Sequence, residues 1–211
     1  GELSEAWGFG AGARVVPDRQ EERPRPVPLV DAITIAPDTQ SISRKAGALL
    51  DLSGIAKGFA VDLVAERLLA AGMRHFLIEI GGELRGEGID PSGQPWWVDV
   101  EMPPTSSVQP YRVALHDLSI ATSGNYRRNV TIDGQAYSHS FDPRTGRPIA
   151  HGTSSVTVLH RSCMMADGWA TALTVMPVSE AMALADQQQL AACVVTGDRE
   201  HVTAKWREML D

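Results

Sequence analysis

Three short segments of the sequence combine residues able to bind an anion, hold a cation and move a proton. The first spans residues 51–58, reads DLSGIAKG, and leads from a small-residue turn into a helix. Free N–H groups at a helix start attract anions, Lys57 adds a phosphate-binding cation, and Asp51 offers an acceptor for a base or a ribose. A corner built of small residues for packing alone is the alternative, because glycine-rich turns are common.

The second segment, DGWAT, places Asp167 and Thr171 four residues apart. In a helix, this spacing puts both side chains on one face. A carboxylate and a hydroxyl are hard oxygen donors that suit Mg2+, which keeps waters or phosphate oxygens in its octahedron. Taken alone, the spacing favours another interpretation, in which Asp167 stabilises the positive end of its helix and Thr171 bonds to the carbonyl one turn earlier.

The third segment, SHSFDPRTG, contains His139 at the end of an expected hairpin strand, followed by a compact turn that begins at Asp142. A strand edge and a rigid proline turn can hold an imidazole at a fixed angle. Histidine titrates near neutrality, so it is a natural base for removing a proton from an attacking hydroxyl. The alternative is a surface histidine beside a turn that only reverses the chain.

Two weaker segments can contact a ligand or form plain loops. One is ATSGNY, which contains Ser123 and Gly124, and the other is the Gly81-Gly82-Glu83 stretch. Their glycines permit close approach of the backbone to a flat ring. They support a ligand site without defining one.

Strand and helix patterns alternate around these segments. Apolar residues at helical spacing predict helices over residues 55–71, 164–176 and 179–188. The Asp133-Gly134 pair is typical of a tight hairpin turn. Mixed helices and strands with several hairpins predict an α+β fold with antiparallel sheets and packed helices. Strand patterns cover residues 32–36, 41–43, 48–52, 75–80, 96–101, 111–115, 129–132, 135–138, 154–160 and 191–196.

Composition narrows the classes of function. The 211 residues include 43% hydrophobic and 21% charged residues, which is typical of a globular chain, and we expect one domain over residues 1–211 with a proline- and charge-rich loop at 14–28. The net charge of -7 argues against sequence-independent nucleic-acid binding. Cys163 and Cys193 are too few for a disulfide scaffold and are expected in the core. No apolar run approaches the length of a membrane span.

Taken in order, the segments resemble the ApbE family of flavin transferases, also called FAD:protein FMN transferases. The matching stretches are DLSGIAKGFAVD, IEIGGELRGEG, ATSGNY, SHSFDPRTGRPI and ADGWATALTVM. Five ordered matches are far more specific than any one of them. The resemblance implies an α+β fold with FAD bound in a cleft between lobes and Mg2+ at its pyrophosphate.

The family's functional positions fall on particular residues of this chain. The resemblance implies FAD contacts at Asp51, Lys57 and Ile149, and a catalytic base at His139. It also implies a metal site formed by the Gly54 carbonyl with Asp167 and Thr171. The other expected FAD-binding residues are Trp7, Gly8 and Phe9 of the WGFG segment, with Gly82, Glu83, Ser123, Gly124 and Asp142.

The implied reaction is Mg2+-dependent transfer of FMN from FAD to a Ser or Thr hydroxyl of an acceptor flavoprotein, with release of AMP. Two alternatives stay open: hydrolysis of FAD to FMN and AMP at the same site, and flavin binding or maturation without turnover. Family members carry a further portion before WGFG that this chain is expected to lack, together with a possible membrane tether. Ala170 stands where some relatives have a second acidic ligand, which implies a weaker metal site. The resemblance implies a periplasmic setting.

Overall fold

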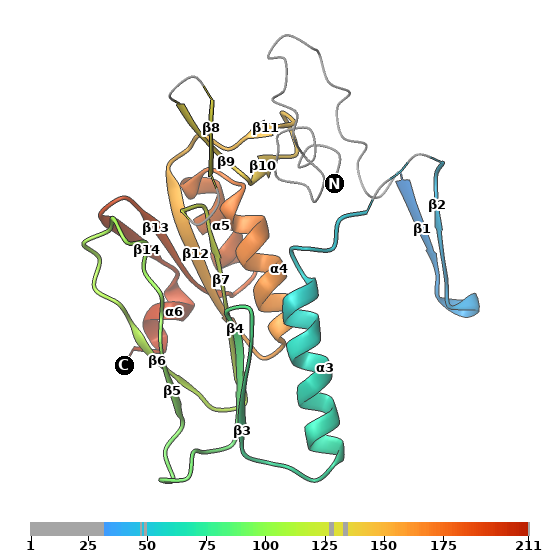
Figure 1. Ribbon diagram of the computed structural model, residues 1–211, viewed down its shortest axis with the longest axis vertical. Coiled ribbons are helices and arrows are strands. Elements are labelled where there is room, and N and C mark those ends of the chain that lie inside the picture. Colours follow the sequence, from blue (N-terminus) through green and yellow to red (C-terminus); the bar gives the residue numbers. More distant parts are fainter. Residues whose placement is uncertain (1–31, 47, 49, 127–128, 133–134, 211) are drawn as a thin grey trace. The chain divides into compact units, whose positions relative to one another are not determined.

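The computed structural model describes residues 32–46, 48, 50–126, 129–132 and 135–210 (Figure 1). They form two compact units. We call residues 52–126 and 150–210 the sheet unit, and the described residues up to 51 together with 129–149 the hairpin unit. The expected loop at 14–28 and the WGFG segment lie outside the described residues, and the one-domain interpretation stays a prediction.

A six-stranded sheet forms the centre of the sheet unit, and every neighbouring pair of its strands is antiparallel. The neighbouring inner strands β13 and β12 are buried along most of their length, because both of their faces are covered. In sheet order the strands are β14 (Arg199–Val202), β13 (Ala191–Thr196), β12 (Thr153–His160), β7 (Leu118–Gly124), β4 (Glu83–Glu87) and β3 (Phe76–Ile80).

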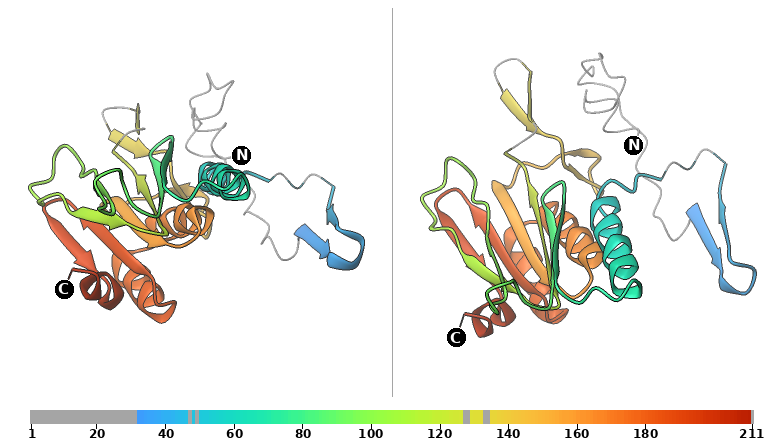
Figure 2. Two further views of the ribbon diagram at one scale, coloured as in Figure 1. Left: turned by 90° about the horizontal axis from the view of Figure 1, so that it is seen from below. Right: turned by 60° about the horizontal axis from the view of Figure 1, so that its bottom comes forward.

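Helices α4 (Cys163–Thr174) and α5 (Val178–Gln187) cover one face of this sheet. Small residues of α4, among them Ala166 and Ala170, pack there against Val156 and Val158 of β12. Figure 2 shows α4 beside α3 (Ala56–Ala70), so the two helices that carry the sequence motifs are neighbours.

The opposite face is covered by a hairpin of β5 (Trp96–Asp99) and β6 (Arg112–Leu115) and by α6 (Ala204–Glu208). Trp206 of α6 is buried in this second core and meets the ring of Tyr111 edge-on, with ring centroids 5.4 Å apart. Cys163 and Cys193 are both buried and unpaired, as the sequence predicts.

Helix α3 packs through Val61 and Ala65 onto Ile78 of β3 and Cys163 of α4. Its apolar residues outnumber the buried ones, because Phe59 and Leu63 are exposed on the far side. Strands β3 and β4 are joined by the two-residue turn Gly81-Gly82, in which both glycines have positive φ. Backbone of that conformation is typical of tight hairpins and admits glycine with little strain.

The hairpin unit contains three two-stranded pairs. They are β1 (Ile33–Ala36) with β2 (Ser41–Arg44) across the 3-10 turn η1 (Pro37–Thr39), β8 (Asn129–Ile132) with β9 (Gln135–Ser138), and β10 (Phe141–Asp142) with β11 (Arg147–Pro148). The pairing of Ile132 with Gln135 confirms the hairpin predicted from the intervening Asp-Gly pair, which itself lies outside the described residues.

The α+β prediction is confirmed, and one strand prediction is wrong. Residues 48 and 50–52 form no strand, and the side chains of Leu50 and Leu52 are exposed. An apolar run makes a strand only when another strand pairs with it, and here the run leads instead into the first turn of α3. Among the described residues, no helix is long and apolar enough to cross a membrane.

Candidate functional site

The start of α3 lies directly against α4, and Gly58 is the reason the two helices come so close. A Cβ atom added to Gly58 would stand 2.3 Å from the carbonyl oxygen of Cys163, so no side chain fits there. The N–H of the buried Gly58 donates to Oδ2 of Asp167, with 3.0 Å between the two atoms. An N–H in the first turn of a helix has no partner within that helix, so Asp167 caps α3 from α4.

Asp167 is a buried carboxylate, and the residue is only 4% exposed. Burial raises its pKa, and the Gly58 N–H and the charge of Lys57 oppose that effect without cancelling it. The protein's own groups therefore do not fully replace the hydration that the ionised Asp167 carboxylate loses on burial. A bound cation beside Asp167 would supply the missing compensation.

Thr171 lies one turn further along α4, next to Gly54. Its Oγ1 donates to the Gly54 carbonyl oxygen at 3.5 Å, and a Cβ on Gly54 would stand 3.0 Å from its Cγ2. The structure thus brings together the three expected metal ligands through contacts with the start of α3. A carbonyl, a hydroxyl and a carboxylate form a hard oxygen set that suits Mg2+, so the residues present fit this ion. Their metal-binding role stays a prediction.

Lys57 extends from the first turn of α3 to Oε1 of Glu83, the first residue of β4. Glu83 is 1% exposed, whereas the Lys57 side chain is 44% exposed. Burial raises the pKa of Glu83, Lys57 opposes the change, and the negative charge of Asp167 adds to it. Two buried carboxylates and one partly exposed lysine side chain therefore share this end of the sheet unit.

Asp62 is a structural residue that the sequence analysis missed. From α3 it accepts hydrogen bonds from the N–H groups of Cys163 and Met164 at 2.9 and 3.0 Å and from the Ser162 hydroxyl at 2.7 Å, and so caps α4. Burial alone would raise the pKa of Asp62, but these bonds and Arg85 outweigh burial and leave the pKa lowered. A lone carboxylate in the apolar stretch FAVDLVA is the signal that could have indicated it.

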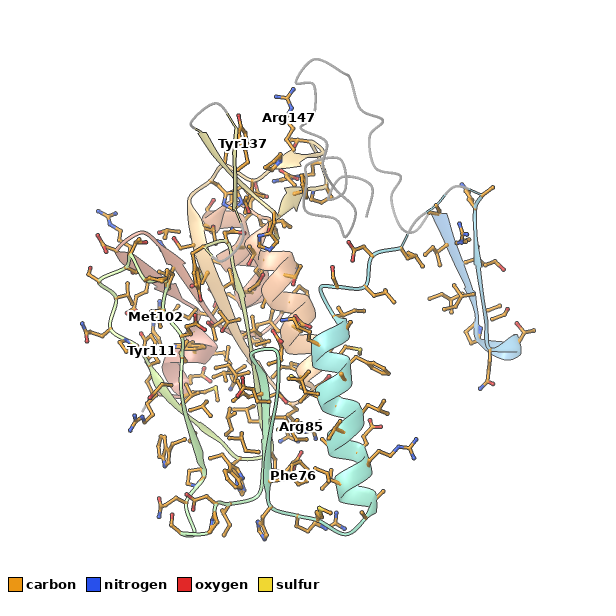
Figure 3. The ribbon with its side chains drawn as sticks, in the orientation of Figure 1. Phe76, Arg85, Met102, Tyr111, Tyr137 and Arg147 are labelled. Atoms are coloured by element: carbon orange, nitrogen blue, oxygen red, sulfur yellow. The ribbon has the colours of Figure 1, made fainter. Side chains whose placement is uncertain are left out.

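Arg85 reaches from β4 toward α3, as Figure 3 shows, and its Nη1 donates to Asp62 at 2.8 Å. Its other nitrogens bond Glu87, two residues along the same strand. This ion-pair chain links β4, α3 and the start of α4.

Ser123 and Gly124 end strand β7. Alternation along the strand puts Ser123 on the same face as Ala121, which α4 covers. Gly124 lies against the ring of Tyr126, whose hydroxyl bonds Glu101 at 2.9 Å. Gly82 completes the turn that precedes Glu83. Roles for Ser123, Gly124 and Gly82 in FAD binding stay predictions.

The remaining expected residues belong to the hairpin unit or lie outside the described residues. Asp142 anchors the predicted compact turn: its oxygens accept from the Arg144 N–H at 2.8 Å and from the Gly146 N–H at 2.8 Å. Ile149 pairs through its N–H with the carbonyl of Ser140 at 3.0 Å. His139 lies between β9 and β10, and Asp51 is exposed at the end of its segment. The roles of Asp51, His139, Asp142 and Ile149 stay predictions, as do those of Trp7, Gly8 and Phe9, which are not described.

The fold and this arrangement define an α+β protein with a candidate anion and cation site at the start of a helix. A sequence model of the ApbE family matches residues 1–194. The chain is 40% identical over 220 residues to the FAD:protein FMN transferase of Vibrio cholerae, a match that covers 100% of this chain and 65% of that protein. The chain therefore belongs to the ApbE family.

Solved structures agree with this assignment. The flavin transferase ApbE from Vibrio cholerae matches with a TM-score of 0.86 and 38% identity, covering 99% of this chain and 69% of that chain. The apo form of the flavinyl transferase ApbE from Pseudomonas stutzeri matches with a TM-score of 0.86 and 35% identity, covering 98% of this chain and 66% of that chain. The chain thus spans about two thirds of the length of these relatives.

Proposed function

We propose that this protein transfers FMN from FAD to a Ser or Thr hydroxyl of an acceptor flavoprotein, with Mg2+ and with release of AMP. The names of the relatives support the donor and the transferred group. The observation that carries the proposal is the convergence of Lys57, Asp167 and Thr171 at the start of α3. A cation, a hard oxygen set and a helix N-terminus are what a pyrophosphate requires.

Each of these groups has a distinct task. Lys57, more accessible than its partner Glu83, binds a phosphate oxygen of FAD. Asp167, Thr171 and the Gly54 carbonyl would hold Mg2+, which supplies charge neutralisation at the pyrophosphate. His139 accepts the proton of the acceptor hydroxyl. Positioning and electrostatics therefore provide most of the catalysis, as in other phosphoryl transfers.

The reaction exchanges one phosphorus–oxygen bond for another. The acceptor oxygen forms a bond to the FMN-side phosphorus of FAD, and the bond from that phosphorus to the bridging oxygen breaks. AMP leaves with the bridging oxygen and its electron pair. The proton released by the hydroxyl passes to His139 and then to solvent, so atoms and charge balance.

Mass measurement of the acceptor tests the proposal. The purified protein is incubated with FAD, Mg2+ and a candidate acceptor flavoprotein, and AMP is quantified in the same sample. We expect the acceptor to gain the mass of FMN with one AMP released per modification. AMP and FMN release without a mass gain would replace transfer by hydrolysis, and FAD binding without AMP would indicate a flavin-binding protein without turnover.

Family membership also supports a proposal for the setting. We propose that the protein acts in the periplasm, on an acceptor flavoprotein located there. Fractionation of cells that produce the complete protein, followed by detection with an antibody, tests this. Recovery with cytoplasmic markers would contradict it.

A further inference from the structure

In the described structure the buried carboxylate of Glu83 has one side-chain partner, Lys57. Its Oε1 accepts from the Lys57 ammonium, while its Oε2 is covered and has no hydrogen-bond partner in the described structure. A ligand therefore cannot reach Oε2 without displacing other atoms. Glu83 can therefore affect a bound ligand only through Lys57.

The arrangement is unfavourable for stability alone. A carboxylate that is 1% exposed with one unpaired oxygen loses most of its hydration, and a single salt bridge to a half-exposed lysine returns only part of it. An amide or an apolar side chain would be less costly at this position. Residues that break the ordinary rules of burial are concentrated at functional sites.

The turn before Glu83 also lies against the side chain of Lys57. Gly81 has φ +65°, and a Cβ atom there would stand 3.1 Å from Cδ of Lys57 and 3.7 Å from Oε2 of Glu83. The methylene stem of Lys57 thus lies across the bare backbone of Gly81. Any larger residue would push the stem away, so backbone and carboxylate together limit where the ammonium can go.

We propose that Glu83 and Gly81 are positioning residues that hold the Lys57 ammonium ready for a phosphate of FAD. This inference rests on the proposed function. A lysine carries its charge on a flexible four-carbon stem, and ordering that stem opposes binding. When the protein orders the stem before FAD arrives, the ligand meets a prepared cation and binds more tightly.

A double-mutant cycle tests the proposal. FAD affinity is measured by flavin fluorescence titration for the unsubstituted protein, Glu83→Gln, Lys57→Ala and the double variant. If Glu83 acts through Lys57, Glu83→Gln weakens FAD binding about tenfold, and adding it to Lys57→Ala changes nothing further. Effects that multiply in the double variant, or full affinity in Glu83→Gln, would overturn the proposal.

Glu87→Gln is the matched control, because Glu87 is also a buried acid of β4 but pairs with Arg85. It removes the same charge from the same strand and should leave FAD affinity unchanged. Thermal unfolding of every variant identifies losses that come from misfolding. A loss of affinity in Glu87→Gln as large as in Glu83→Gln would show that a buried charge in β4 matters in general, against the proposal.

The Gly81→Ala variant provides a second test of the proposal. Gly93→Ala carries comparable backbone strain, since Gly93 has φ +83°, but its Cβ would meet nothing within 4 Å. We expect Gly81→Ala to weaken FAD binding only while Lys57 is present, and Gly93→Ala to have no effect on it. An equal loss with and without Lys57 contradicts positioning. Failure of the unsubstituted protein to bind FAD would instead remove the proposed function itself.

Discussion

The Gly58 N–H donates to Oδ2 of Asp167 across 3.0 Å, which joins the first turn of α3 to the middle of α4. One carboxylate therefore caps a helix and, under the proposed function, also holds the metal. Stability and activity respond differently to changes at this position, and the difference can be measured.

Asp167→Asn should separate the two tasks. The amide oxygen still accepts from Gly58, and removal of a buried charge leaves stability near its original value or higher. The loss of an anionic ligand should lower Mg2+-dependent AMP release by roughly a hundredfold or more, since metal ions contribute several kcal/mol to such transition states. Asp167→Ala should also lose about 1–3 kcal/mol of unfolding free energy. Equal AMP release by Asp167→Asn and the original protein would exclude the metal role.

Gly58→Ala should destabilise the protein because its Cβ meets the Cys163 carbonyl at 2.3 Å. We expect a loss of about 1–3 kcal/mol in urea unfolding, despite the better helix propensity of alanine. Gly168→Ala is the control: it also lies in a helix, but its Cβ meets only a movable methyl of Ile55 at 3.1 Å. The interpretation of Gly58 as a close-contact residue is wrong if both variants are equally stable.

Asp62→Asn should lower stability at neutral pH by about 1–3 kcal/mol, because it weakens the cap on α4 and removes the charge that pairs with Arg85. The pKa of Asp62 is lower in the folded protein than the value of 3.8 for the unfolded chain. Its contribution to stability is therefore fully present at pH values above 3.8 and is lost as the pH falls through the folded pKa. The gap between the two proteins should therefore close in acid.

Chemical denaturation at several pH values measures this gap. Asp99→Asn serves as the comparison, since Asp99 also has a lowered pKa but forms an exposed pair with Arg112. Its effect should be much smaller at neutral pH. A gap for Asp62→Asn that stays constant into acid would contradict the assigned role.

Thr171→Val should abolish the response of AMP release to Mg2+, whereas Thr171→Ser keeps the hydroxyl and most of the response. Thr174→Val tests specificity one turn away: Thr174 is buried and its hydroxyl bonds the Ala170 carbonyl at 2.7 Å. That variant should lose some stability and keep the Mg2+ response. A normal Mg2+ titration in Thr171→Val would remove the hydroxyl from the metal site.

His139→Ala tests the expected base. AMP release should fall by about 100- to 10,000-fold, the usual contribution of a general base, while FAD affinity is largely retained. Single-turnover measurement of AMP with saturating FAD gives the comparison. Equal release from both proteins would remove His139 from the mechanism.

Several secondary-structure elements of this protein can be predicted from the sequence alone. Helical spacing predicts α3, α4 and α5 to within a few residues, and the Asp-Gly pair predicts the β8–β9 hairpin. These features depend on neighbours a few positions apart, for which chain geometry fixes the outcome. The run at 48–52 shows the limit, because its apolar residues predict a strand and only the absence of pairing at residues 48 and 50–52 excludes one.

The sequence by itself determined the family, the α+β class and the spacing of Asp167 and Thr171 on one helix face. Only the tertiary structure decided that Glu83 pairs with Lys57, that Asp167 caps α3 and that Asp62 caps α4. These contacts join residues 26 to 109 positions apart. No local pattern encodes them, because they depend on how α3 packs against β4 and α4. Gly58 allows the close approach of α3 to α4 by leaving no side chain between the two helices.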